Sequence, residues 1–182
     1  MQLLNSDIVF QGRTEAIYKV IVIGDPAVGK TSLLTKFAKN QFEENYLPTV
    51  GVNILKEPIS LDESTVVNLM FWDVAGQPQF YMLHRPYFNG ADGVIFTFNL
   101  SIPSSFSHLN FWYRNVITYG LRRVPHILLG IKDEVYKNEK IKIKKIFEIS
   151  NLMNVPYFKI IFPHIGNLKY IFKYLALRIY NH

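Results

Sequence analysis

The sequence predicts an α/β fold in which a six-stranded, mostly parallel sheet with one antiparallel edge strand carries helices on both faces. Short apolar segments rich in β-branched and aromatic residues alternate with longer segments of helical period. One pair of apolar segments is joined by only four residues, which leaves no room for a helix and predicts an antiparallel hairpin. A chain of 182 residues that is 49% hydrophobic can bury one sizeable core, and it fits one domain better than two.

The first strand is expected at residues 17–23, after a loosely attached N-terminal extension of residues 1–16, so that the domain spans 17–182. A helix should follow at 32–39, and the hairpin strands at 52–60 and 65–72. Leu168, Ile171, Phe172, Leu175 and Ile179 share one stripe of the last helix. The remaining strands are expected at 93–100, 125–131 and 156–162, and the remaining helices at 104–120, 139–153 and 167–180.

The composition excludes several classes of protein. The chain has no cysteine, so disulfides and thiolate zinc sites are impossible, and a reducing, cytoplasmic location is the simplest expectation. Prenylation and palmitoylation also need cysteine, and Gln2 excludes N-terminal myristoylation, so we expect no lipid anchor. The N-terminus lacks the pattern of a signal peptide, and every apolar run is shorter than the roughly 20 residues that span a bilayer.

The net charge of +6 is concentrated in the second half of the chain. Residues 1–91 hold seven basic and nine acidic side chains, whereas residues 92–182 hold thirteen and five. Two interpretations stay open: ordinary solvated helix faces, or weak peripheral contact with an anionic partner or lipid surface. Aromatic residues are not interleaved with the basic ones, so no specific nucleic-acid binding is expected.

The segment GDPAVGKT, Gly24 to Thr31, predicts a phosphate-binding loop because it follows a strand and precedes a helix. Its backbone N–H groups and the helix N-terminus should surround an anion, which indicates the fold of a P-loop NTPase. Lys30 should reach the β and γ phosphates, and the Thr31 hydroxyl should ligate Mg²⁺. The expected phosphate-binding residues are Asp25, Pro26, Ala27, Val28, Gly29, Lys30, Thr31 and Ser32, although Pro26 has no N–H to donate.

A second phosphate-side motif, WDVAGQPQF, ends the second hairpin strand. Asp73 at the strand end can hold Mg²⁺ through water, and Gly76 can offer its N–H to the γ phosphate. Gln77 follows at a position from which it could orient an attacking water.

Together with FEENYLPTVGV, these motifs resemble a small GTPase of the Ras superfamily, closest to its Rab-like branch, from about Tyr18 to Ile179. The resemblance implies Mg²⁺ as cofactor and GTP and GDP as ligands. It implies that Thr49 ligates Mg²⁺ and senses the γ phosphate, and that Phe42 packs against the base. Gln77, Lys30 and Thr49 are then the catalytic set.

The resemblance also implies a monomer whose two switch segments, one around Thr49 and one around Gln77, contact partner proteins. Ile54, Trp72 and Tyr87 fall near the apolar patch that faces effectors in the family. Exchange factors and GTPase-activating proteins are the other expected partners.

The guanine-recognition motifs depart from the family pattern. In HILLGIKDEV, Ile131 stands where the family has Asn, and Glu134 where it has Asp, while Lys132 is kept. In place of Ser-Ala-Lys the chain has Ile161, Phe162 and Pro163. The expected base-binding residues are Phe42, Lys132, Glu134 and the Phe162 N–H, and we expect guanine preference or affinity to be weakened.

Three hypotheses about function remain open from the sequence. The intact phosphate and Mg²⁺ residues favour a GTP-dependent switch with slow hydrolysis. The altered guanine motifs favour a pseudo-GTPase that keeps the fold as an interaction scaffold. A third hypothesis keeps hydrolysis but relaxes the choice of base.

Overall fold

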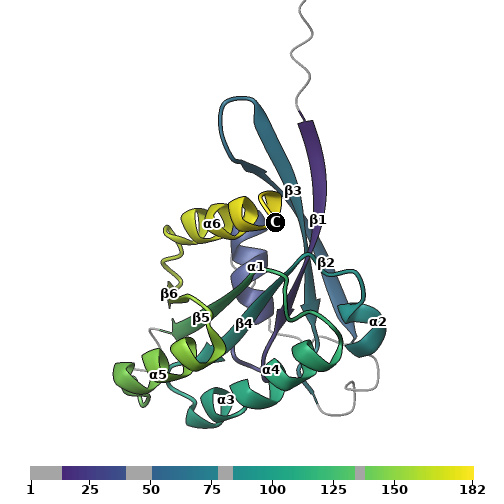
Figure 1. The fold of residues 1–182 in the computed structure, drawn as a ribbon. Helices are drawn as coiled ribbons and strands as arrows, with labels where there is room; N and C mark the ends of the chain where they lie inside the picture. Colours follow the sequence, from purple (N-terminus) through teal and green to yellow (C-terminus); the bar gives the residue numbers. More distant parts are fainter. Residues whose placement is uncertain (1–13, 40–50, 78–83, 134–137) are drawn as a thin grey trace, which may run out of the picture.

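The computed structural model of the chain describes residues 14–39, 51–77, 84–133 and 138–182, and it confirms the predicted α/β fold. Six strands form a single sheet, and helices lie on both of its faces (Figure 1). The strands are β1 (Thr14–Ile23), β2 (Val52–Ser60), β3 (Thr65–Val74), β4 (Gly93–Asn99), β5 (His126–Asp133) and β6 (Tyr157–Phe162).

The strand order is β2-β3-β1-β4-β5-β6, with only the β2–β3 pair antiparallel. That pair is the predicted edge hairpin. Its turn is closed by the Asp62 side chain, whose Oδ1 accepts hydrogen bonds from the N–H groups of Ser64 at 2.8 Å and Thr65 at 2.7 Å. All other neighbours pair in parallel, which requires crossover helices between them.

The helices are α1 (Lys30–Lys39), α2 (His84–Phe88), α3 (Pro103–Ser107), α4 (Leu109–Thr118), α5 (Ile143–Met153) and α6 (Leu168–Tyr180). The single helix predicted at 104–120 is wrong, because it is interrupted at His108. The helix predicted from residue 139 begins only at Ile143. The Lys140 N–H donates to the Leu100 carbonyl at 2.9 Å, which holds the preceding segment against the end of β4.

Three strands are longer than predicted, and one of them, β3, ends at Val74 rather than at residue 72. β1 begins at Thr14 rather than at residue 17, because residues 14–16 continue the parallel pairing with β3. β5 continues to Asp133, which pairs with Phe162 of β6. The division into an extension of residues 1–16 and a domain of 17–182 stays a prediction.

The core has two layers, one on each face of the sheet, because successive strand residues point to opposite sides. In β1, Val20 and Val22 face one layer, and Ile21 and Ile23 face the other. The first layer is covered by α1 and α6, and the second by α2, α4 and α5. The predicted stripe of α6 is buried in full: Leu168, Ile171, Phe172, Leu175 and Ile179.

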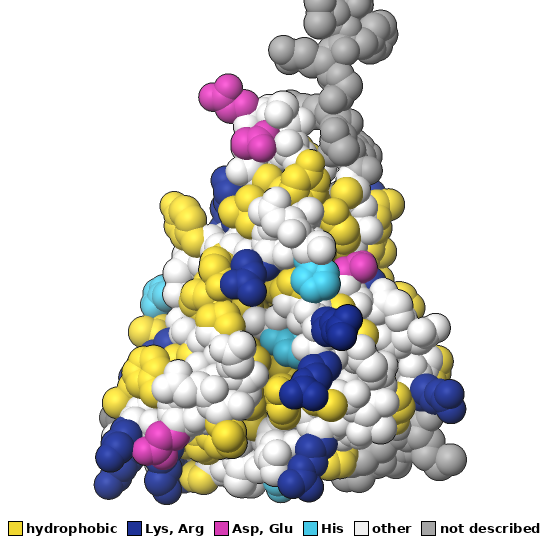
Figure 2. All heavy atoms as spheres, in the orientation of Figure 1, with side chains coloured by type: hydrophobic (Ala, Val, Ile, Leu, Met, Phe, Trp, Pro, Cys, Tyr) yellow, Lys and Arg dark blue, Asp and Glu magenta, His cyan; other side chains and the backbone are white. Residues whose placement is uncertain are grey.

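The basic residues of the second half lie mostly at the surface, as the exposed Lys140, Lys142, Lys144 and Lys145 illustrate. Figure 2 shows Lys and Arg side chains dispersed among apolar and neutral ones over this face rather than gathered in one patch. In the part of the chain that the structure describes, no helix is both long and apolar enough to cross a membrane.

Candidate functional site

The loop between β1 and α1 has the backbone shape of an anion-binding loop. Gly24, Ala27 and Gly29 have positive φ angles of 150°, 59° and 105°, and such reversals let neighbouring N–H groups point into one concavity. Gly24 cannot be replaced, because a Cβ there would lie 2.2 Å from the carbonyl oxygen of Thr97 in β4. The close approach of β4 therefore fixes where the loop begins.

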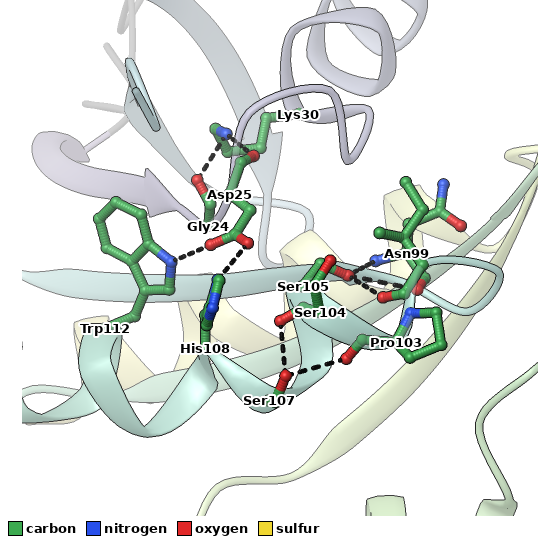
Figure 3. Close-up of polar contacts among 11 residues, drawn as sticks. Gly24, Asp25, Lys30, Asn99, Pro103, Ser104, Ser105, Ser107, His108 and Trp112 are labelled. Carbon is green, nitrogen blue, oxygen red and sulfur yellow. Dashed lines mark hydrogen bonds and ion pairs between the residues drawn. The ribbon is translucent and has the colours of Figure 1, made fainter. Parts of the chain in front are cut away.

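Lys30, the first residue of α1, lies under this loop and is only 6% exposed. Its Nζ donates to the carbonyl oxygens of Gly24 and Asp25, both at 2.8 Å (Figure 3). Burial lowers the pKa of Lys30 to about 8, while the Asp73 and Asp25 carboxylates act in the opposite direction. A buried ammonium held at a helix N-terminus is arranged to meet a negative ligand.

Thr31 and Asp73, the two predicted metal ligands within the described residues, lie beside the lysine. The Thr31 hydroxyl donates to Oδ2 of Asp73 at 2.5 Å. Asp73 is fully buried near the end of β3, where it pairs in register with Val22 of β1. A hydroxyl and a carboxylate are oxygen donors of the kind Mg²⁺ prefers. No group of three or more His, Cys, Asp or Glu that could hold a metal occurs among the described residues.

Gly76 and Gln77 lie against the phosphate loop on its other side. A Cβ on Gly76 would come within 2.3 Å of the Gly24 carbonyl oxygen, so the two backbones are nearly in contact. The Gln77 side-chain oxygen Oε1 is buried and has no hydrogen-bond partner within the described ranges. A cavity of about 20 Å³ lies between the loop and residues 75–77. That volume is enough for one water molecule.

The Asp25 side chain is directed away from the concavity, toward the break between α3 and α4 (Figure 3). Its Oδ2 lies 2.6 Å from Nδ1 of His108, and its Oδ1 accepts a hydrogen bond from Nε1 of Trp112 at 2.9 Å. Sequence reasoning did not predict any link between this helical segment and the phosphate loop.

On the base side, Ile131 packs against the phosphate loop. It is 2% exposed, and its Cδ1 and Cγ2 atoms lie 3.6 Å from where a Cβ of Gly29 would be. Lys132 follows it, and its Nζ lies 3.4 Å from Oε1 of Glu139. Lys159 donates to the same oxygen at 2.5 Å, and this hydrogen bond is the main reason that the pKa of Glu139 is lowered.

The other predicted base residues are only partly covered by the structure. Phe162 is half-buried at the end of β6, opposite Asp133. Phe42 and Glu134 lie outside the described residues, as does Thr49 of the predicted catalytic set.

The three residues of the predicted effector patch lie near one another. Ile54 of β2 is 44% exposed and pairs in register with Trp72 of β3. The ring centroids of Trp72 and Tyr87 are 6.4 Å apart. Lys19 Nζ lies 3.8 Å from the centroid of the Trp72 ring on which it stacks.

A glycine loop wrapped over a buried lysine at the start of a helix is how P-loop proteins hold nucleotide phosphates, and this chain is of that class. The model of the Ras family matches residues 19–181, nearly the whole described domain. The chain therefore belongs to the Ras family, and it is a Rab-like small GTPase of the Ras superfamily.

Two relatives illustrate the likeness. The chain is similar to the GTP-binding protein ypt1 of Schizosaccharomyces pombe, at 30% identity over 141 residues, which cover 78% of this chain and 69% of the relative. It is also similar to the Ras-related protein Rab-1 of Theileria parva, at 31% identity over 142 residues, covering 78% of this chain and 64% of the relative.

Proposed function

We propose that this protein is a GTP-binding molecular switch with slow, Mg²⁺-dependent hydrolysis of GTP to GDP. The observation that carries the proposal is the buried Lys30 beneath the phosphate loop, with the Thr31–Asp73 hydrogen bond beside it. A buried ammonium is costly unless something negative compensates it, and a polyphosphate would do so.

In the proposed reaction a water attacks the γ phosphorus in line with the bond to the leaving GDP, and the products are GDP and inorganic phosphate. Gln77 orients that water together with the carbonyl of Thr49. The buried Gln77 Oε1 beside a cavity of about 20 Å³ supports this role, since the group has no other partner among the residues described. Lys30 and the loop N–H groups stabilise the charge that develops on the transferring phosphoryl group.

Magnesium, held by Thr31, Thr49 and, through water, Asp73, would neutralise phosphate charge. Residues 42–52 contain no arginine that could serve as an internal arginine finger. We therefore expect turnover on the order of 10⁻⁴ to 10⁻² per second without an activating partner.

Slow hydrolysis suits a switch whose loops report the nucleotide state to other proteins. We propose that effectors, exchange factors and GTPase-activating proteins bind the two switch segments and the Ile54, Trp72 and Tyr87 patch. We further propose a monomer in the cytoplasm, without a specific nucleic-acid partner, whose membrane contact is at most weak and peripheral.

The base side supports a weaker preference for guanine. Ile131 meets Gly29 through carbon atoms alone, where the resemblance expects an amide. The Lys132 ammonium is engaged by Glu139. These same observations favour the alternative function, a pseudo-GTPase or a relaxed-specificity nucleotide-binding scaffold that acts as an interaction module.

One set of measurements separates these functions. The nucleotide that co-purifies with the protein is identified by chromatography, and the affinities for GTP, ATP and XTP are then measured with Mg²⁺. Tight, selective binding of GDP and GTP, with turnover abolished by Gln77→Leu, supports the switch. Comparable affinities for several bases support relaxed specificity, and a protein that binds none of them would be a pseudo-GTPase.

A further inference from the structure

The Asp25 carboxylate connects the phosphate loop to a distant helical segment. Its side chain is 13% exposed, and each of its two oxygens has its own partner, His108 for Oδ2 and Trp112 for Oδ1 (Figure 3). His108 lies between α3 and α4, and Trp112 is four residues further on, so both project from the same side of the helical segment.

The main chain of Asp25 contacts the phosphate-binding lysine. Its carbonyl oxygen accepts one of the two hydrogen bonds from Lys30 Nζ, at 2.8 Å, and the other goes to the neighbouring Gly24. One residue thus joins α4, through its side chain, to the phosphate-binding lysine, through its main chain. Displacing the Asp25 side chain would displace an anchor of Lys30.

The direction of the carboxylate also matters for binding an anion. A carboxylate turned into the loop would repel a polyphosphate at close range. Held by His108 and Trp112, the Asp25 carboxylate points toward α4 and away from the Lys30 ammonium (Figure 3).

We propose that His108 and Trp112 are positioning residues which act through Asp25 to hold the phosphate loop and Lys30 in the conformation that binds nucleotide phosphates. This inference rests on the proposed function of nucleotide binding. The two residues touch no phosphate themselves, and their effect passes through one carboxylate.

The two positions allow variants of different severity. The His108 side chain is 57% exposed, so His108→Ala removes the contact without opening the core. His108→Asn restores a donor near the place of Nδ1. Trp112 is fully buried, so Trp112→Phe is the variant of choice because it deletes the N–H and keeps a large ring. Asn110→Ala is the matched control, an exposed polar residue on the same helix.

The principal assay is the dissociation rate of a fluorescent GDP analogue in the presence of Mg²⁺. A charge-assisted hydrogen bond lost at the loop should raise the rate about tenfold in His108→Ala and in Trp112→Phe. His108→Asn should stay within about twofold of wild type, and Asn110→Ala should equal it. In an Asp25→Ala background, His108→Ala should have no further effect, since its target is gone.

A second readout is independent of nucleotide. The chain has two tryptophans, so a spectrum of ¹⁵N-labelled indole groups has two signals, and Trp72→Phe assigns them. In the nucleotide-free protein, the Trp112 signal should change its chemical shift in both Asp25→Ala and His108→Ala. The melting temperature of the His108→Ala protein should equal that of wild type.

The outcomes distinguish a failure of the proposed nucleotide binding from a failure of the proposed positioning role. If wild-type protein bound no nucleotide, the proposed function and this inference would both be overturned. If wild type binds but His108→Ala and Trp112→Phe release nucleotide at its rate, the inference alone is wrong. It is equally wrong if His108→Ala accelerates release as much in the Asp25→Ala background as in wild type.

Discussion

Replacing Gly76 by alanine tests how closely the segment after β3 must approach the phosphate loop. The new Cβ would lie 2.3 Å from the Gly24 carbonyl oxygen and 2.7 Å from both the Asp25 carbonyl carbon and the Pro26 nitrogen. All three neighbours are backbone atoms, so no side chain can rotate away. The two segments must separate, and overpacking of this kind costs about 1–3 kcal/mol in the free energy of unfolding.

The same separation should also reduce the affinity for nucleotide selectively. Gly24 and Asp25 anchor Lys30, and the Gly76 N–H is the proposed donor to the γ phosphate. We therefore expect Gly76→Ala to lose about tenfold more affinity for GTP than for GDP, as one lost charged hydrogen bond would produce.

Denaturant unfolding and titration with fluorescent nucleotides measure the two effects. Gly166→Ala is the control, because a Cβ there meets nothing within 4 Å and the residue has no positive φ. That control should leave both quantities near wild type. A Gly76→Ala protein with wild-type stability and an unchanged ratio of GTP to GDP affinity would refute the packing argument.

Four further predictions follow from the site and its surroundings. Gln77→Leu should slow single-turnover phosphate release at least about tenfold with GTP affinity kept, and equal release would exclude Gln77 from the reaction. Chelating Mg²⁺ should speed nucleotide release about tenfold or more in wild type but little in Thr31→Ala, and equal acceleration in both would argue against the Thr31 ligand. Ile131→Asn should raise the selectivity for GTP over ATP about tenfold, and it should lower the melting temperature because it puts a polar amide at a buried site. Unchanged selectivity would show that the lost amide is not the cause of weakened guanine preference. Burial lowers the pKa of His126, so the unfolded state binds more protons below that group's ordinary pKa, and stability should fall as the pH drops from 7 to 5. His126→Gln, which can still donate to the Leu121 carbonyl, should show a shallower pH dependence in denaturant unfolding, and an identical slope would contradict the assignment.

The fold could be predicted because its signals are local. The stripe of α6 follows from a period of 3.6 residues, and it is confirmed by burial. The break at His108 could not be found in this way. Leu109, Trp112 and Val116 keep helical spacing and are all buried. The apolar pattern therefore gives no sign that α3 ends at Ser107 and that a new helix begins at Leu109.

The proximity of the phosphate-side residues could also be predicted, because a contiguous motif and one strand end supply most of them, whereas their roles stay predictions. The contacts of Asp25 with His108 and Trp112 could not, since the partners are 83 and 87 residues apart. Nothing in the spacing of either segment marks them for each other. Only the folded chain brings the start of α4 beside the loop that follows β1.

Beside the expected base-binding residues, the structure shows a contact that the sequence motif does not predict. The sequence indicates that Ile131 lacks an amide, but it does not indicate what replaces the lost tie to the phosphate loop. In the structure the tie is apolar, since Ile131 lies against Gly29 and is almost fully buried. Contacts between carbon atoms hold β5 and the phosphate loop together but distinguish no hydrogen-bonding edge of a base. Lys132, the one expected base-binding side chain of β5 within the described residues, is paired with Glu139. We therefore expect the preference of this protein for guanine to be weakened.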